Sequence, residues 1–425
     1  MELNKSLLDD VKKYVDYISD FGEGEICLSS GIQRKSEVVR NELNQDIEKE
    51  ILGYSIRLFI DGKEGTFSLK KLNKNVLDKI IKITKSNSKK EYFNGLPENN
   101  ITKPKKLSSS KLKKFTFDKI NTIQEDILSE IGNEVNYNSK ISYDENIVYF
   151  LNTNGVEFKE KDYSISGSFS SVYNDSGYSD YISTCKNIEY RDFKQKALNS
   201  KKLAIKFYEA DKLKEKPKSV TLLPDCFSSM INYSYSSNLS AKNIEKNRSI
   251  YDNFKTKAID NNISIIDDPF IFGSESSSNY DLEGVNCKKS KIVDQGNLVN
   301  PITDYNTALE NDLDYFGNYF SGVSFRNVIF EHENMLKESE YEKGDLLIDN
   351  VIGAHTSNSS TTEFSVNVHS AFYFDGSDFI PVNNFMISGK MKDMLDKSCG
   401  VVRYKKPLKS LYINALKSNC NVTLN

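Results

Sequence analysis

Tryptophan is absent from this 425-residue chain, histidine occurs only three times, and the six cysteines are widely spaced. The closest two cysteines, Cys399 and Cys420, are 21 residues apart, so the chain contains no CxxC pair and no ladder of disulfide partners. In a chain of this length, such spacing is typical of a reducing compartment. A zinc site would have to be built from very few histidine and cysteine ligands.

An excess of charge of one sign and long hydrophobic runs are also missing. The 57 basic and 60 acidic residues give a formal net charge of -3, which offers no overall field to attract nucleic acid or an anionic membrane. No uninterrupted apolar run approaches the ~20 residues that a membrane-spanning helix needs. The first ten residues, MELNKSLLDD, lack the apolar segment of a signal peptide. We therefore expect a soluble, cytoplasmic protein.

Signatures of common enzyme classes are missing as well. The chain has no GxSxG nucleophile motif, no GxxxxGK[ST] phosphate loop and no GxGxxG dinucleotide motif. His332 and Glu333 begin a zinc-protease motif, but Leu336 stands where HExxH needs its second histidine. Lys337 stands at that place in the longer HExxxH, and a protonated lysine cannot bind zinc. This fragment therefore predicts no metal site.

Two groups of carboxylates, Asp267-Asp268 and the pair Asp281 and Glu283, could act as acid and base or bind a cation. Carboxylates in turns more often cap the local backbone or face solvent. We therefore favour the structural interpretation for both groups. The residues alone indicate no self-evident catalytic centre.

The pattern of elements predicts an α+β protein of two domains, because 425 residues exceed one ordinary core. We expect the domains at 1–212 and 213–425, with the charged segment 211–219 as the linker. Hydrophobic periodicity predicts helices over 3–18, 76–83, 117–131 and 193–207. Hairpins are predicted around Asp61-Gly62 and Asn154-Gly155 and within 164–184, and the segment 36–46 is expected to continue extended. Strands are predicted in the second half at 263–269, 345–353, 362–376 and 379–389.

A lysine-rich segment, KPKKLSSSKLKK (103–114), carries six lysines in twelve residues. It could be an arm that contacts phosphates, or a solvated connector. No aromatic residue alternates with the lysines, and the whole chain is slightly acidic. We therefore favour the connector.

Two of the three histidines, His355 and His369, lie in the stretch DNVIGAHTSNSSTTEFSVNVHSAF (349–372). Fourteen residues of extended chain would hold them too far apart to share one ion, unless TSNSS (356–360) turns the chain back onto an adjacent strand. The alternative is that each is an ordinary sheet or loop histidine, which we favour. Alternation between 364 and 369 predicts one buried and one polar face.

The order of several segments along nearly the whole chain resembles the TldD/PmbA family, and within it the PmbA (TldE) branch. No single block is decisive, but their order and spacing together carry the resemblance. The segments are RKSEVVRNEL, YSIRLFIDGKEGTFSL, NGLPE (94–98), FLNTNGVEF, RSIYDNF (248–254), ISIIDDP, DLEGV (281–285), KIVDQGNLVNPITDYNTA (291–308), the stretch 349–372 and FIPVNNFMISGKMKDML.

The resemblance implies an N-terminal α/β domain and a C-terminal β-rich, barrel-like domain. In this family a TldD-like subunit, a zinc metallopeptidase with HExxxH and a cysteine ligand near its C-terminus, pairs with a TldE-like subunit. The TldE-like subunit has no metal site and completes an enclosed chamber. The pair degrades unfolded peptides and trims leader peptides, and an older label for the branch is modulator of DNA gyrase.

The position of the metal motif separates the two kinds of subunit. Counted back from Ser249, which the family shares, HExxxH would fall at about 232–237, where this chain reads NYSYSS. That window contains neither histidine nor glutamate. Cys399-Gly400 faintly resembles the cysteine ligand, but one thiolate cannot hold a catalytic zinc. The resemblance therefore implies a non-catalytic subunit without a cofactor, with zinc expected only in a TldD-like partner.

We expect this chain to form a heterodimer with that partner, or a homodimer, and to contact peptide. The stretch 349–372 is then a chamber wall or interface, whose polar members would face substrate or partner: His355, Ser357, Asn358, Glu363 and Ser365. They could equally be turn and strand residues that face solvent. Two other functions compete, a stand-alone homodimeric peptide-binding or scaffold protein and a modulator of gyrase or nucleic acid. The net charge argues against direct DNA binding.

Overall fold

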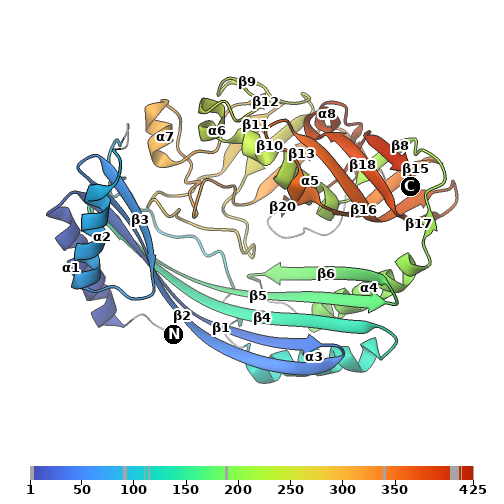
Figure 1. Cartoon of the computed structure of the whole chain (residues 1–425), viewed down its shortest axis with the longest axis horizontal. Coiled ribbons are helices and arrows are strands. Elements are labelled where there is room, and N and C mark those ends of the chain that lie inside the picture. Colours follow the sequence, from blue (N-terminus) through green and yellow to red (C-terminus); the bar gives the residue numbers. More distant parts are fainter. Residues whose placement is uncertain are drawn as a thin grey trace.

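The computed structural model describes residues 4–89, 93–109, 111–112, 115–186, 190–337, 341–402, 411–412 and 414–424. Helices and strands are mixed within these ranges and the sheets are curled, which confirms the predicted α+β class (Figure 1). Among the described helices, none is long and apolar enough to cross a membrane.

The N-terminal part is one six-stranded sheet with the order β3-β2-β1-β4-β5-β6, in which every neighbouring pair is antiparallel. Figure 1 shows it as a curved layer below the C-terminal part, with helices at both ends. The strands are β1 (Glu23–Val39), β2 (Glu42–Ile60), β3 (Lys63–Leu69), β4 (Asn136–Asn152), β5 (Glu157–Tyr173) and β6 (Ser176–Thr184). The helices are α1 (Lys5–Ser19), α2 (Lys74–Ser86), α3 (Phe117–Ile131) and α4 (Tyr190–Tyr208).

Turns with left-handed backbone join the strands of this sheet. Asp61-Gly62 has φ angles of 53° and 71°, which fits the predicted hairpin. The extended run expected over 36–46 is wrong, because the chain reverses at Arg40 and Asn41, with φ angles of 51° and 66°. Asparagine tolerates this conformation, and the Asn41 Oδ1 accepts a hydrogen bond from the backbone N–H of Tyr137 at 2.9 Å.

The alternation of side chains on β1 and β2 gives the sheet two different buried faces. Ile26 and Ile56 belong to a core that α1 and α2 cover, whereas α3 and α4 cover a second core further along the sheet. Cys27 points to the opposite face and packs with Phe150 of β4 and with Tyr280 from the C-terminal part. One face of the sheet therefore contacts its own helices, and the other contacts the C-terminal part of the chain.

The C-terminal part contains two further sheets. The larger has ten strands with the order β14-β19-β21-β8-β15-β16-β17-β7, and β18 and β22 extend it beside β16. Its strands are β7 (Asp211–Lys212), β8 (Ser219–Leu222), β14 (Met335–Leu336), β15 (Asp345–Ile352), β16 (Glu363–Phe374), β17 (Phe379–Asn383), β18 (Phe385–Lys390), β19 (Gly400–Val402), β21 (Ala415–Ser418) and β22 (Asn421–Leu424). The expected domain boundary after residue 212 stays a prediction.

The smaller sheet has the order β20-β13-β10-β11-β12-β9. Its strands are β9 (Thr256–Lys257), β10 (Ile263–Asp267), β11 (Ser290–Asp294), β12 (Asn297–Leu298), β13 (Val328–His332) and β20 (Leu411–Tyr412). Three short helices lie between β8 of the larger sheet and β9 of the smaller one: α5 (Pro224–Ser234), η2 (Ser236–Leu239) and α6 (Ala241–Glu245). Three others join strands of one sheet: α7 (Tyr305–Glu310), η4 (Ala354–Thr356) and α8 (Met391–Asp396).

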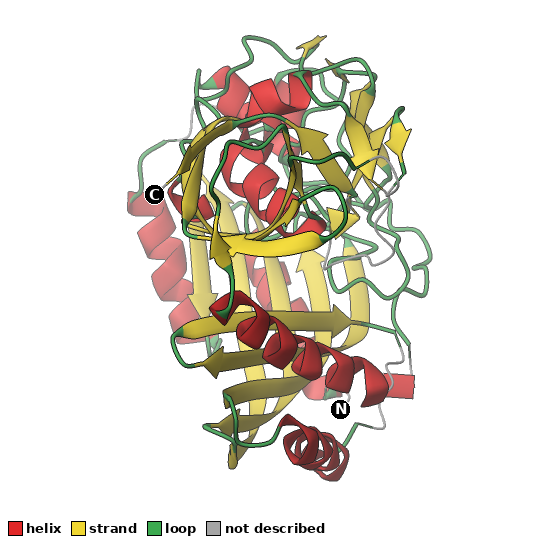
Figure 2. Ribbon diagram, turned by 90° about the vertical axis from the view of Figure 1, so that its right-hand side faces the viewer, coloured by secondary structure: helices red, strands yellow, loops and turns green. Residues whose placement is uncertain are grey.

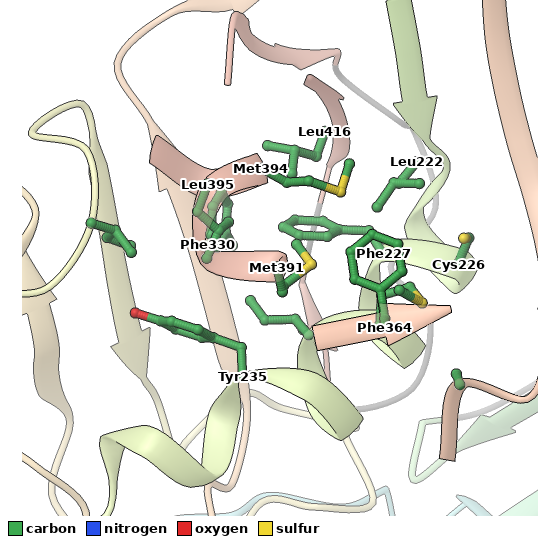
Figure 3. Close-up of a cluster of buried hydrophobic side chains, with 14 of the residues drawn as sticks. Leu222, Cys226, Phe227, Tyr235, Phe330, Phe364, Met391, Met394, Leu395 and Leu416 are labelled. Atoms are coloured by element: carbon green, nitrogen blue, oxygen red, sulfur yellow. The ribbon is translucent and has the colours of Figure 1, made fainter. Parts of the chain in front are cut away.

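The larger sheet curls around α5, which gives the C-terminal part its barrel-like form (Figure 2). Pro224 stands in the first turn of this helix, where its missing N–H is not needed. Phe227 is fully buried, and its ring meets Phe330 edge-on with 5.0 Å between centroids. Figure 3 shows Phe227 among Leu222, Phe364 and Met391, which belong to different elements of the same core. The helix thus fills the barrel.

The strand β16 has the alternation predicted for it. Phe364, Val366 and Val368 are buried, whereas Ser365 and Asn367 are exposed. The predicted strand over 379–389 is two strands, because Asn384 has a φ of 58° and separates β17 from β18. Both of these strands pair with β16, each along a different half of its length.

The lysine-rich segment is more than a solvated connector. Lys103, Lys105 and Lys106 are exposed, as expected, but Leu107 is buried. The backbone of Lys105 exchanges hydrogen bonds with the side chain of Asn279, at 2.8 and 3.0 Å. These bonds fasten the segment to the C-terminal part; residues 110, 113 and 114 lie outside the described ranges.

Candidate functional site

A cavity of about 570 Å³ lies in the C-terminal part, between the end of α5 and the loop that leads into β13. Residues 231–243 supply one wall, with Asn232, Ser236 and Ser237 among its polar groups. The loop 319–328 supplies another wall, which includes Tyr319 and Arg326. The window 232–237, where the family resemblance would put a metal motif, therefore borders this cavity.

Three side-chain hydroxyls in the window 232–237 already have hydrogen-bond partners within the C-terminal part. The Ser234 and Ser236 hydroxyls donate to backbone carbonyls four residues earlier, at 2.6 and 2.7 Å, where α5 ends. The Tyr235 hydroxyl is buried against the hydroxyl of Tyr251 at 2.7 Å, and burial raises the pKa of Tyr235 well above its usual value. None of these groups is a neutral imidazole, a carboxylate or a thiolate, so the residues present do not fit a catalytic zinc.

Histidines, cysteines and carboxylates elsewhere in the described ranges form no group of three that could hold a metal ion. The Nε2 of His369 lies 2.6 Å from the carbonyl oxygen of Gly177, to which it donates a hydrogen bond. His332 is buried, which lowers its pKa, and its Nδ1 accepts the backbone N–H of Asn334 at 3.0 Å. His355 lies on η4, so the three histidines have separate surroundings.

Arg326 is positioned by its own backbone. Its N–H and the N–H of Asn327 both donate to the Asp267 Oδ1 at 2.9 Å, and the Asn318 amide donates to the other oxygen at 3.1 Å. Asp267 is buried, and burial raises its pKa to about 7. The Arg326 guanidinium stacks over the ring of Phe320 and borders the cavity. Burial lowers its pKa to about 10, which still leaves it cationic at neutral pH.

Tyr319 separates the cavity from a buried cluster of charges at the contact between the two parts of the chain. Its ring lies 5.3 Å from the guanidinium carbon of Arg57. Arg57 forms ion pairs with Glu25, its cross-strand neighbour, and with Glu283 from the C-terminal part, each at 2.8 Å. Burial raises the pKa of Glu25 to about 7, although Arg57 opposes that shift. The cluster joins the N-terminal sheet to the loop 281–286.

Tyr315 belongs to the same cluster. Its hydroxyl is within hydrogen-bonding distance of the Asp281 Oδ2 and of the Glu283 Oε2, the latter at 2.7 Å. A phenol has one proton to donate, so it serves one of these two carboxylates at a time. Burial, and secondarily the charge of Glu283, raise the pKa of Asp281 to about 7. A proton on Asp281 would relieve the repulsion between the two.

The structural interpretation of Asp281 and Glu283 is therefore only half right. The Asp281 Oδ1 does cap the local turn, because it accepts the N–H groups of Glu283 and Val285 at 3.1 and 2.9 Å. Neither carboxylate faces solvent, since Asp281 is 0% and Glu283 1% exposed. Asp268 caps the local backbone as expected, because its Oδ1 accepts the N–H of Phe270 at 3.0 Å.

None of the five residues expected to face substrate or partner lines the cavity. His355 is exposed and meets the ring of Tyr233 edge-on, with 6.4 Å between centroids. Asn358 caps the following turn by accepting two backbone N–H groups. Glu363 is 3.6 Å from the Lys390 ammonium, and Ser365 is on the exposed face of β16.

Ser357 is half-buried, and its hydroxyl has no hydrogen-bond partner among the described residues. A hydrogen bond links the segment 355–365 to Asn238 near the cavity wall: the Asn238 side-chain amide donates to the carbonyl oxygen of Ser359 at 2.6 Å. A role in contacting substrate or partner stays a prediction for all five residues. Arg326 and Tyr319 were not expected from the sequence, because YFSGVSFR (319–326) has neither strand nor helix periodicity.

Two comparisons with known sequences found relatives. Residues 216–407 match the family model for the PmbA/TldA metallopeptidase C-terminal domain. An uncharacterized protein of Methanocaldococcus jannaschii is 24% identical over 369 residues, which cover 81% of this chain and 83% of that protein.

Solved structures share the fold along nearly the whole chain. A proposed modulator of DNA gyrase from Bacteroides thetaiotaomicron superimposes with a TM-score of 0.85 at 18% identity, and 100% of each chain is covered. A similar protein from Thermotoga maritima gives 0.83 at 19% identity, covering 98% of this chain and 100% of that one. TldE from Thermococcus kodakarensis gives 0.84 at 18% identity, covering 97% and 99%. The sequence match to the PmbA/TldA C-terminal domain model covers residues 216–407, and the solved structures show that this chain shares their fold.

Proposed function

We propose that this chain is the non-catalytic, TldE-like subunit of a peptidase complex. In that complex it pairs with a TldD-like zinc metallopeptidase and encloses peptides that the partner cleaves. One observation carries the proposal: the window 232–237 borders the cavity but supplies amide and hydroxyl groups where a catalytic subunit would carry HExxxH. The chain keeps the family fold, and these residues suit contact with a peptide better than they suit a metal.

Two exposed surfaces of the C-terminal part suit a binding role. The exposed face of β16 carries polar side chains, Ser365 and Asn367, over a buried apolar face. A polar sheet face can line a chamber that holds a peptide. Beside it, Tyr233 is 46% exposed and contacts His355. An exposed aromatic residue next to polar ones is a common feature of protein interfaces.

The test is peptidase activity measured for three samples: the purified chain, an HExxxH-bearing relative from the same genome, and their mixture. We expect no cleavage of an unfolded peptide by the chain alone and clear cleavage by the mixture. The matched control is the mixture in which the relative carries glutamine in place of its HExxxH glutamate, which should be inactive. Cleavage by the lone chain that persists in chelator would contradict the proposal.

Co-elution of the two chains in size-exclusion chromatography tests the pairing separately. A chain that elutes only as its own dimer, and neither binds nor activates the relative, would favour a stand-alone binding or scaffold protein. A cytoplasmic location and the absence of direct nucleic-acid binding are part of this proposal. The second is tested by a DNA-binding assay at low salt, where any electrostatic binding would be strongest.

A further inference from the structure

Arg326 is half-buried and differs from the buried Arg57 in having no counter-ion among the residues that the structure describes. Arg57 has two carboxylates at 2.8 Å. For Arg326, no carboxylate of the described ranges lies within ion-pairing distance, and its Nε is buried without a hydrogen-bond partner. A guanidinium offers five N–H donors, and burying a charge without a partner is costly. Such a group at the wall of a cavity is suited to an anion that comes from outside the chain.

The carboxylates near Arg326 and at the cavity already have hydrogen-bond or ion-pair partners. Both oxygens of Asp267 accept hydrogen bonds from residues of the loop that carries Arg326. Asp281 accepts two backbone N–H groups with one oxygen and the Tyr315 hydroxyl with the other. Asp304, which borders the cavity, caps α7 and lies 3.9 Å from the ammonium of Lys242. None of the three is free to turn toward the guanidinium.

The cavity itself has the size and mixture of groups expected of a ligand site. Its volume of about 570 Å³ falls within the ~300–1,000 Å³ that small-ligand sites occupy. Ile231, Leu239 and Val323 give it apolar walls, and Asn232 and Ser324 add hydrogen-bonding groups. These walls leave room for the end of a chain or for a side chain, rather than for a folded protein.

We propose that this cavity binds a carboxylate of a peptide, held by Arg326, while the apolar walls take the neighbouring side chain. A planar guanidinium matches a carboxylate in a two-pronged contact, which an amide cannot reproduce. Two sources have this chemistry, the free C-terminus of a peptide and the side chain of aspartate or glutamate. The choice of a peptide as ligand rests on the proposed function, but binding is a property of the lone chain.

The experiment is calorimetric titration of the full-length chain, without any partner, with short apolar peptides. The three peptides share one sequence: one has a free C-terminus, one has a C-terminal amide, and one has the amide and an internal glutamate. We expect the free acid to bind at least about tenfold more tightly than the amide, as for loss of a charge-assisted contact. Recovery of binding by the glutamate peptide would identify the side chain as a sufficient source.

Substitutions of Arg326 test whether its guanidinium binds the carboxylate. Arg326→Gln should weaken binding of the free acid to the level of the amide. Arg326→Lys should bind the free acid with intermediate affinity, because lysine keeps the positive charge but lacks the planar, two-pronged guanidinium. The matched control is Arg34→Gln on the N-terminal sheet, which removes an arginine outside the cavity lining and should change binding by less than about threefold. Circular dichroism verifies that each variant is folded.

Equal binding of the acid and amide peptides to the wild-type chain would overturn the inference, as would unchanged binding by folded Arg326→Gln. Absence of binding by all three peptides at millimolar concentration would overturn it too. The comparison of acid with amide needs no variant, so it decides even if Arg326→Gln does not fold. Carboxylate-dependent binding by a chain that activates no partner would leave this inference standing and contradict the proposed pairing.

Discussion

The replacement of Arg57 by methionine tests how the two parts of the chain are held together. Arg57 on β2 links Glu25 of the N-terminal sheet to Glu283 of the C-terminal part, with both ion-pair distances at 2.8 Å. The three side chains are 10%, 7% and 1% exposed. Methionine has a similar length and an apolar surface. The variant therefore keeps much of the apolar packing and removes the charge and the two hydrogen bonds that the guanidinium supplies to the carboxylates.

Breaking a buried ion pair by removing one partner costs about 3–5 kcal/mol, because a buried charge is left without compensation. Glu25 can reduce this cost by taking up a proton. Burial already raises the pKa of Glu25 to about 7 from its usual value of 4.5, with Arg57 present and opposing the shift. Without Arg57 that pKa should rise further, so the cost depends on pH.

The sign of the pH dependence follows from linkage. Because the folded-state pKa of Glu25 lies above its unfolded value, the folded state binds more protons between those values. The stability that Glu25 contributes is present below pH 4.5 and is lost as the pH rises through about 7. For Arg57→Met we expect a loss near the upper end of 3–5 kcal/mol at about pH 8, and a clearly smaller loss at about pH 5.

The assay is urea denaturation followed by circular dichroism, because the chain has no tryptophan to report unfolding by fluorescence. The matched control is Arg34→Met, which removes an arginine from the same sheet but from a more exposed pair with Glu48, whose side chains are 24% and 48% exposed. Exposed pairs contribute less than about 1 kcal/mol. A loss for Arg57→Met that equals the control, or that does not change between the two pH values, would refute the reasoning.

Four further substitutions test the core, the contact between the parts and the predicted site. Phe227→Ala should lower the unfolding free energy by about 3–5 kcal/mol in the same urea assay, since it empties the centre of the barrel; a loss below about 1 kcal/mol would contradict that packing. Gly284→Ala should lower the thermal midpoint, because the glycine has a φ of 84° and a Cβ would lie 2.7 Å from the ring of Phe150; an unchanged midpoint would count against that contact. His355→Ala and Asn358→Ala should weaken partner-dependent peptidase activity, and an unchanged rate would remove both residues from the site.

The sequence was informative where local chemistry decides the structure. Asp61-Gly62 makes a left-handed turn almost without steric cost, and the hairpin formed there. The strict alternation in β16 leaves only one register with β18 that buries Phe364 and Val366. Arg40 and Asn41 turn the chain just as sharply, but arginine gives no turn signal. That hairpin is stabilised by contacts with Tyr137, nearly a hundred residues away in sequence.

The candidate site could be predicted only in part for the same reason. Resemblance to a family pointed to the window 232–237, and that window does border the cavity. The charged cluster could not be found in this way, because Arg57 and Glu283 are 226 residues apart and meet only when the two parts pack together. Arg326 lies in a loop without periodicity, and its missing counter-ion is a property of the folded chain.

The most direct test of the central claim is native mass spectrometry of this chain with an HExxxH-bearing relative from the same genome, with metal content measured on the same samples. The account predicts a complex of one copy of each chain that contains a single zinc ion. It also predicts that the lone chain carries no stoichiometric zinc. Stoichiometric zinc in the lone chain, lost when Cys399 or His355 is replaced, would contradict the account, because it would show a metal site in a subunit proposed to have none.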